Sequence, residues 1–177
     1  MPKCEGPEIL QRRSLARHAK SAVHAAEGDL LSLEAQESHT FGHDAETVWA
    51  LIRPAENAVL LGSARRAFTV PGTPSGVGEQ QCFIGSDGSA SISEVIGEAV
   101  PRWTATRLVT PSEAEIRQSY ELEPAGEGCT LKIGIVLEAR TTEESVLNYE
   151  RAWRANTRQF LARAAQILDM QQRERLD

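Results

Sequence analysis

The chain has 177 residues and a formal net charge of −6, with 41% hydrophobic and 25% charged residues. This composition is typical of one globular domain that is long enough to bury a sizeable core. The acidic balance argues against a nucleic acid as the main partner, because phosphates bind to basic surfaces. No apolar run is long enough to span a bilayer, and the first residues lack the apolar stretch of a signal peptide. We therefore expect a cytoplasmic protein without integral membrane association.

Motifs for metal or cofactor chemistry are missing from the sequence. The three cysteines, Cys4, Cys82 and Cys129, are odd in number and widely spaced, which suits neither a disulfide framework nor a zinc site. His39 and His43 are four residues apart at the end of a predicted strand, so they do not share one helical face. Nucleotide-binding glycine fingerprints and hydrolase motifs are also missing. We expect no metal and no cofactor.

The N-terminal segment predicts a helix over residues 7–27, which ends at Gly28. Its apolar face consists mostly of alanine, and its other residues include several arginines and lysines. Two interpretations are open: an additional helix that packs on or extends from the domain, which we favour, or a helix that binds a membrane surface or a partner. We assign residues 1–28 to an N-terminal extension, 29–172 to the main domain and 173–177 to a C-terminal tail.

The main domain begins with a strand and two short helices. Residues 30–41 alternate between apolar and polar side chains, which is typical of a half-buried strand. Gly42 allows a turn, and Asp44 stands at the N-cap position of a short amphipathic helix. Pro54 ends this helix and can open a second one, which extends to about Leu61.

Short strands and one long helix make up the rest of the chain. Glycine or proline separates six further apolar segments, a spacing typical of an antiparallel meander. These segments are 64–70, 79–85, 89–100, 102–110, 115–123 and 130–140. An unbroken amphipathic helix follows from Thr142 to about Gln172, and at 1.5 Å per residue it is about 40 Å long.

This order of elements resembles the helix-grip fold of the SRPBCC superfamily, over roughly residues 30–170. The resemblance is carried by the stretches "HDAETVWALI", "GVGEQQCFI", "SEVIGEAVPRWTATRLV" and "YELEPAGEGCTLKIGIVLEA". The superfamily contains START-type lipid-binding domains, plant pathogenesis-related allergens and a polyketide cyclase/dehydrase and lipid-transport group. The resemblance implies an α+β fold in which a curved antiparallel sheet of six or seven strands wraps around a long C-terminal helix. It also implies a cavity between the sheet and that helix.

Strand and helix periodicity indicates which side chains face this cavity. In residues 115–123 the alternation directs Gln118 and Tyr120 inward, where polar groups need a partner. That partner is a ligand in one interpretation, and a neighbouring side chain or an ordered water in the other. The aromatic residues of the long helix form either a ligand wall or plain core packing. The candidate ligand-binding residues are Phe68, Gln118, Tyr120, Ile133, Ile135, Tyr149, Trp153, Asn156 and Phe160.

The charged residues of the early strands leave two alternatives open. Arg66 shares one side of its strand with Phe68, and an inward arginine would need a carboxylate or an anionic ligand. Glu94 and Glu98 provide carboxylates if they face inward, but the alternation fits an inward Val95 equally well. We favour a surface position for these charged residues.

Three functions remain compatible with the sequence. We favour the binding of an apolar small molecule, such as a lipid or polyketide-like compound, for transport or sensing. The alternative is a polyketide cyclase or dehydratase in which Tyr120 or His39 donates or accepts a proton, helped by Arg66. A third possibility is a protein-interaction module without a ligand. The inward positions are chiefly neutral, which favours binding over catalysis, and the protein is a possible homodimer.

Overall fold

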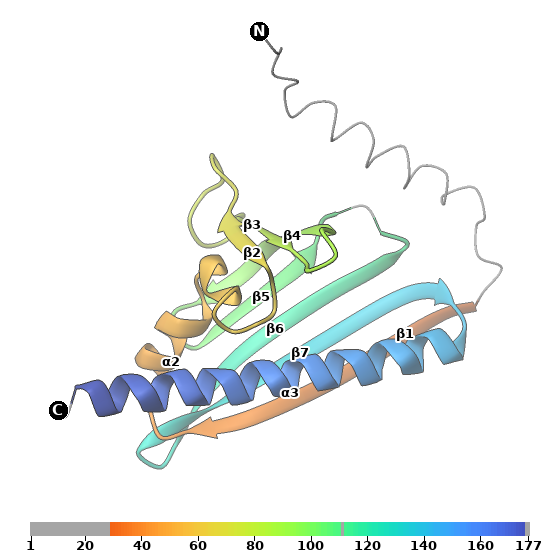
Figure 1. Ribbon diagram of the computed structural model, residues 1–177. Coiled ribbons are helices and arrows are strands. Elements are labelled where there is room, and N and C mark those ends of the chain that lie inside the picture. Colours follow the sequence, from red (N-terminus) through yellow and green to blue (C-terminus); the bar gives the residue numbers. More distant parts are fainter. Residues whose placement is uncertain (1–28, 111, 176–177) are drawn as a thin grey trace, which may run out of the picture.

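The computed structural model describes residues 29–110 and 112–175. Seven strands form a single sheet in the order β1-β7-β6-β5-β4-β3-β2, and all neighbours are antiparallel (Figure 1). The strands are β1 (Asp29–Phe41), β2 (Arg66–Thr69), β3 (Gln80–Ile84), β4 (Ala90–Ala99), β5 (Trp103–Leu108), β6 (Ala114–Ala125) and β7 (Gly128–Thr141). The strands from β2 to β7 form the expected meander, and β1 closes on β7. The predicted helix over residues 7–27 and Cys4 lie outside the described residues.

Three helices accompany the sheet: α2 (Ala45–Ile52), the 3-10 helix η1 (Ala55–Ala58) and α3 (Glu143–Glu174). The carboxylate of Asp44 caps α2, because its Oδ1 accepts a hydrogen bond from the Thr47 amide at 2.7 Å. The Thr142 hydroxyl caps α3 in the same way, accepting from the Ser145 amide at 3.3 Å. The predicted α+β helix-grip architecture, with a curved sheet and a long C-terminal helix, is confirmed. None of the helices in the described ranges is long and apolar enough to cross a membrane.

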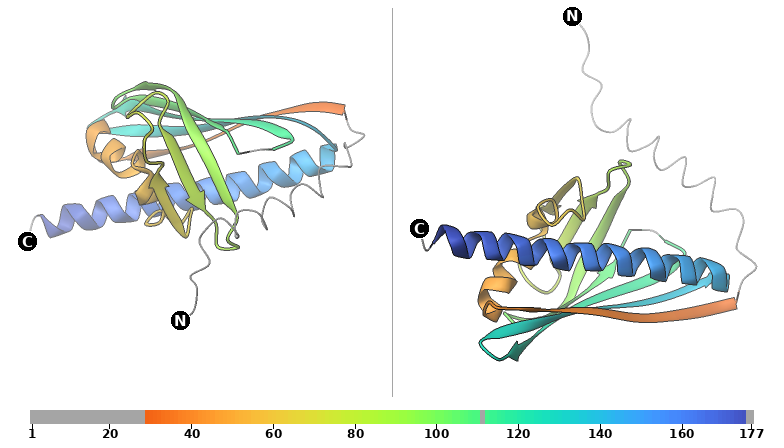
Figure 2. Two further views of the ribbon diagram at one scale, coloured as in Figure 1. Left: turned by 90° about the horizontal axis from the view of Figure 1, so that it is seen from above. Right: turned by 60° about the horizontal axis from the view of Figure 1, so that its bottom comes forward.

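The core lies between α3 and the β1–β7 side of the sheet. Figure 1 shows α3 running along β1 and β7, and Figure 2 shows β2, β3 and β4 crossing above it. The buried residues of α3 recur at steps of three and four, and those of β7 alternate. They are Trp153, Thr157, Leu161, Ala164 and Leu168 on α3, and Cys129, Leu131, Ile133, Ile135, Leu137 and Ala139 on β7. Because the other end of the sheet curves away from the helix, the two do not pack along their whole length.

A β-bulge in β4 explains why the alternation of this strand is ambiguous in the sequence. Val95 pairs with Thr106, but Gly97 pairs with Ala105, so that Ile96 is an extra residue. The extra residue reverses the alternation after it. As a result, Val95 before the bulge and Glu98 after it point to the same, concave side of the sheet.

Candidate functional site

A partly open pocket of about 480 Å³ lies between the concave side of the sheet and α3. It is about three times as large as engineered apolar cavities of about 150 Å³ that bind benzene. It occupies the space that the curving sheet leaves beside the helix. The sheet contributes Phe83, Ser91, Ser93, Thr106, Leu108, Ile116, Gln118, Tyr120 and Ile133, and α3 contributes Tyr149, Ala152, Trp153, Asn156, Thr157 and Phe160.

A smaller recess of about 80 Å³ lies beside this pocket, next to α2 and η1. Gln118, Tyr120 and Phe160 line both spaces, so the recess and the pocket adjoin each other. The α2 helix ends at Ile52, next to the recess, and its Trp49 is buried against the core. The short helices therefore close one end of the pocket.

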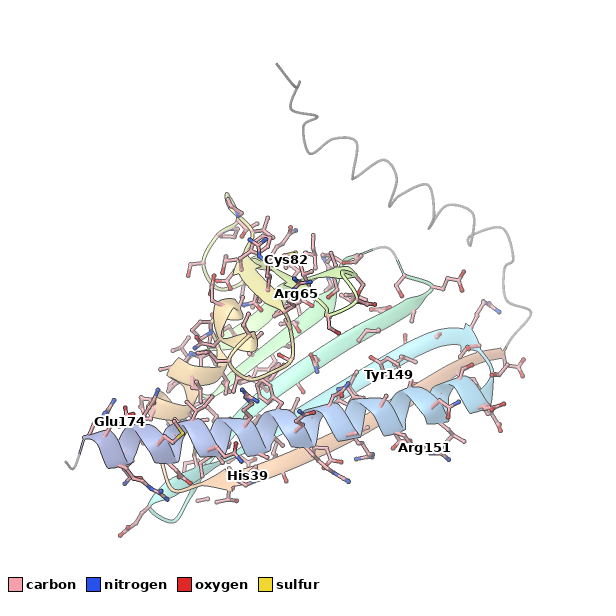
Figure 3. All side chains as sticks on the ribbon, viewed as in Figure 1. His39, Arg65, Cys82, Tyr149, Arg151 and Glu174 are labelled. Carbon is pink, nitrogen blue, oxygen red and sulfur yellow. The ribbon has the colours of Figure 1, made fainter. Side chains whose placement is uncertain are left out.

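Seven of the nine candidate ligand-binding residues border the pocket. They are Gln118, Tyr120, Ile133, Tyr149, Trp153, Asn156 and Phe160. Figure 3 shows Tyr149 on the side of α3 that faces the sheet, whereas Arg151 projects from the other side. Phe68 lies outside the pocket lining, on β2 with 37% of its surface exposed, and Ile135 is buried in the core beneath α3. Binding by any of these residues stays a prediction.

The structure does not bring the three candidate catalytic residues together. Tyr120 lies in the pocket. His39 lies on β1, outside the pocket lining, and its ring packs edge-on against Phe41 with a centroid separation of 4.8 Å. Arg66 is exposed on β2, also outside the lining. The arrangement therefore offers Tyr120 no ionisable partner from this set.

The two tyrosines of the pocket are neutral hydrogen-bonding groups. Burial raises the pKa of Tyr120 to about 12, and burial also raises the pKa of Tyr149. The Tyr120 hydroxyl lies 3.5 Å from Oε1 of Gln118 and can donate a long hydrogen bond to it. At neutral pH both phenols therefore keep their protons, so they suit hydrogen bonding to a ligand oxygen better than proton abstraction.

A charged cluster at the recess was missed by the sequence reasoning. Arg53, which follows the last residue of α2, donates from Nη1 to Oε1 of Glu79 at 2.7 Å and from Nε to Glu98. Gln81 donates from Nε2 to the same oxygen of Glu79 at 2.7 Å. The side chains of Arg53, Glu79 and Glu98 are mostly buried. One signal was present in the sequence: Gln81 and Phe83 alternate onto one side of β3, and Glu79, directly before the strand, continues this alternation.

Arg53 and Glu79 are held in their charged forms. Burial alone raises the pKa of Glu79, but hydrogen bonds from Arg53 and Gln81 outweigh it and bring this pKa below its usual value. Burial alone would lower the pKa of Arg53, but the hydrogen bonds to Glu79 and Glu98 outweigh burial and raise this pKa. The positive charge of the Arg53 guanidinium is therefore balanced by the carboxylates of Glu79 and Glu98. The expected surface position holds for Arg66 but not for Glu98, and Glu94 pairs with the exposed Arg107 at 3.4 Å.

The two walls of the pocket differ in chemistry. The sheet wall carries hydroxyl and amide groups on neighbouring strands, whereas the α3 wall is largely aromatic. The indole Nε1 of Trp153 is enclosed and has no hydrogen-bond partner among the described residues. Within the same residues, no cluster of three or more His, Cys, Asp or Glu side chains is suited to hold a metal ion. The pocket can thus enclose a flat apolar molecule whose oxygen atoms face the sheet.

Comparisons with known proteins support the fold. No family model matches the chain, and no curated protein matches it in sequence. Among solved structures, the protein SA2116 of unknown function from Staphylococcus aureus has a TM-score of 0.69 at 9% identity, over 82% of this chain and 98% of that one. Norcoclaurine synthase from Thalictrum flavum, in complex with dopamine and hydroxybenzaldehyde, has a TM-score of 0.62 at 13% identity, over 80% and 88%.

A third similar structure is the di-domain ARO/CYC StfQ from the steffimycin biosynthetic pathway. Its TM-score is 0.66 at 15% identity, over 96% of this chain and 62% of the StfQ chain. This chain therefore spans less than two thirds of that protein. At such identities the likeness concerns the fold alone. With the strand order and the long C-terminal helix, it shows that the chain has the helix-grip fold.

Proposed function

We propose that this protein binds an apolar small molecule that carries oxygen substituents, such as a lipid or polyketide-like compound, for transport or sensing. The observation that carries the proposal is the pocket of about 480 Å³ between an aromatic helix wall and a hydroxyl-bearing sheet wall. Enclosing the apolar body of a ligand there contributes about 25 cal/mol for each Å² removed from water. The polar groups of the sheet then set its orientation.

The similar structures are consistent with this proposal. One of them was solved with dopamine and hydroxybenzaldehyde, and another is an ARO/CYC protein of a biosynthetic pathway. Because fold does not determine function, the pocket lining carries more weight here than these likenesses do.

A cyclase or dehydratase is the second candidate function. Tyr120 favours it, because a phenol in an enclosed pocket can donate a proton to a reacting oxygen. However, Arg53, which lines the adjoining recess, already has two carboxylate partners, and His39 lies outside the pocket lining. Binding without a reaction is therefore the function that the pocket supports better.

The decisive experiment measures binding of N-phenyl-1-naphthylamine, an uncharged probe whose fluorescence rises in apolar surroundings. Thr106 lines the pocket and Arg107, its neighbour on β5, is exposed on the opposite side. We expect the wild type to bind the probe, and Thr106→Trp to weaken binding about tenfold or more because its indole fills the pocket, a loss of about 1.4 kcal/mol. Arg107→Trp is the matched control and should bind as the wild type does.

A second measurement separates the candidates. Native mass spectrometry of protein purified from its own host should reveal a bound apolar molecule, which can be extracted and offered to the protein again. Turnover of that molecule by the wild type, lost in Tyr120→Phe with binding retained, would establish the enzyme. Unaltered recovery supports binding. Absence of both a co-purified molecule and probe binding would contradict the proposal and favour an interaction module.

A further inference from the structure

Among the polar groups that line the recess beside α2, Arg53 and Gln81 belong to the charged cluster. Arg53 and Gln81 line the recess, whereas Glu79 and Glu98 lie behind them as their partners. Two apolar side chains flank the same space, Trp49 and Phe160. The polar pair therefore shares the recess with apolar side chains that can enclose a ring.

Each member of the pair keeps unused hydrogen-bonding capacity. A guanidinium has five N–H donors, and Arg53 uses Nε and Nη1 for the carboxylates, so that within residues 29–110 and 112–175 its Nη2 donates to no protein acceptor. Gln81 must direct its amide nitrogen to Glu79, because an ionised carboxylate only accepts hydrogen bonds. Its carbonyl Oε1 accepts no hydrogen bond from the described residues. A ligand group that both accepts and donates would satisfy this pair.

The charge of the cluster decides which ligand group is suitable. Two carboxylates surround one guanidinium, so the formal charge of Arg53, Glu79 and Glu98 together is negative. A ligand carboxylate would add a further negative charge to a mostly buried site, where charges are poorly solvated. An uncharged oxygen faces no such repulsion and still accepts from the guanidinium.

We propose that the recess recognises an uncharged hydroxyl group of the ligand, as in a phenol or an enol. Its oxygen accepts from Arg53, and its hydrogen is donated to Oε1 of Gln81. This inference rests on the proposed binding function and specifies its ligand class: a neutral, hydroxyl-bearing ring compound rather than a fatty acid or another carboxylate. Glu98 is a positioning residue here, because it acts through Arg53 and excludes anions.

The test compares three probes of one shape: naphthalene, 2-naphthol and 2-naphthoate. Their dissociation constants are measured by isothermal titration calorimetry, which does not depend on the fluorescence of the probes. We expect 2-naphthol to bind the wild type about tenfold more tightly than either of the other two, the effect of one hydrogen bond to a charged donor. Arg53→Gln should remove the advantage of 2-naphthol over naphthalene.

Glu98→Gln tests the role of charge separately from the shape of the recess. A glutamine can still accept from Arg53, but the formal charge of the cluster becomes neutral, so we expect the ratio of the 2-naphthoate to the 2-naphthol dissociation constant to fall about tenfold. Glu94→Gln is the control on the same strand, because Glu94 pairs with Arg107 on the other side of the sheet. It should leave the ratio unchanged.

The outcomes distinguish this inference from the function on which it rests. Equal binding of all three probes, or a ratio that Glu98→Gln does not change, overturns the inference and leaves the binding function in place. If no probe binds, both fail. Tighter binding of 2-naphthoate than of 2-naphthol by the wild type contradicts the exclusion of anions. Should Arg53→Gln not fold, the Glu98→Gln and Glu94→Gln pair still decides.

Discussion

Tyr120 carries the clearest pH dependence in the pocket. Its pKa is raised to about 12, so the folded protein holds this proton more firmly than the unfolded chain does. The stability that this provides is complete below pH 10 and is lost as the pH rises from 10 to 12. We expect the free energy of unfolding to fall in this window by up to about 1.4 kcal/mol per pH unit, measured by urea denaturation.

Tyr120→Phe provides the matched reference for this dependence. It keeps the ring and removes the titrating hydroxyl, so its free energy of unfolding should fall less steeply above pH 10. Tyr149, the other tyrosine of the sequence, remains in both proteins together with every lysine. Parallel curves for the two proteins would mean that Tyr120 titrates as an exposed phenol does.

Arg53 is the residue whose loss should cost the most stability among the charged residues of the recess. Arg53→Met leaves Glu79 and Glu98 mostly buried without their cation, and we expect a loss of about 3 kcal/mol at pH 7. The wild-type pair stabilises the protein above the usual carboxyl pKa, and this contribution disappears as the pH falls through the lowered pKa of Glu79. The difference between the two proteins should therefore shrink toward pH 4.

Arg107→Met is the control for this effect. Its side chain is 53% exposed and lies 3.4 Å from Glu94, so its loss should change the free energy of unfolding by less than about 0.5 kcal/mol. Equal losses for the two variants, at any pH, would mean that the cluster at the recess is energetically an ordinary surface pair.

These residues also mark how far the sequence predicts the candidate site. Gln118 and Tyr120 were placed in the pocket by alternation, because β6 pairs without a shift along its length. Arg53 follows the last residue of a short helix, where no periodicity indicates the direction of a side chain. Its partner Glu79 comes from the loop before β3 and its partner Glu98 from β4, so their meeting depends on how the sheet curves.

At the scale of elements, β4 shows where a prediction from the alternation of side chains along a strand fails. The sequence of this strand fits two alternations equally well, and the structure uses one before the bulge at Ile96 and the other after it. The bulge is stabilised from outside the strand, since Val95 exchanges backbone hydrogen bonds with Gly78 and Glu79 of the loop before β3. The position of the bulge therefore cannot be predicted from the residues of β4 alone. The existence of each strand, in contrast, can be predicted from the residues of that strand.

The hairpin between β6 and β7 provides a test of backbone packing. A Cβ on Gly128 would lie 1.9 Å from the carbonyl oxygen of Phe41, at the end of β1. Since backbone atoms cannot move aside without breaking the β1–β7 ladder, we expect Gly128→Ala to lower the free energy of unfolding by about 2 kcal/mol. Thermal or urea denaturation measures the loss.

Gly42→Ala is the comparison for that substitution. Gly42 follows β1 directly, and a Cβ there would meet no atom within 4 Å, so the change should stay within about 0.5 kcal/mol. If both alanines are tolerated equally, the close approach of β7 to the end of β1 does not persist in solution.

At the scale of the whole molecule, the order of strands and helices was enough to predict the architecture. A long helix with one apolar side needs a sheet to cover it, and a meander with a returning first strand supplies one. The chemistry of the space between them could not be predicted in the same way. Ser91, Ser93 and Thr106 read as ordinary strand residues, and their hydroxyls border the pocket because the β3–β5 end curves away from α3.

The attachment of α3 to β1 is independent of the pocket and can be tested alone. Glu37 of β1 accepts hydrogen bonds from Arg158 at 2.9 and 3.0 Å and from Arg154 at 2.9 Å. The hydrogen bonds from Arg158, and next those from Arg154, lower the pKa of Glu37. The contribution of Glu37 to the stability of the fold is therefore present above the usual carboxyl pKa and is lost as the pH falls. We expect Glu37→Gln to lower the melting temperature at pH 7 by about 2 °C, and to lower it less near pH 4.

The same variant shows whether stability and binding reside in different parts of the molecule. Glu34→Gln is its control, because Glu34 is exposed on β1 and makes no ion pair with the described residues. None of Glu37, Arg154 and Arg158 lines the pocket, so Glu37→Gln should bind N-phenyl-1-naphthylamine within about twofold of the wild type, below one hydrogen bond's effect. A larger loss of binding would mean that the position of α3 on β1 sets the width of the pocket, and that the grip of the sheet on its helix is itself part of ligand recognition.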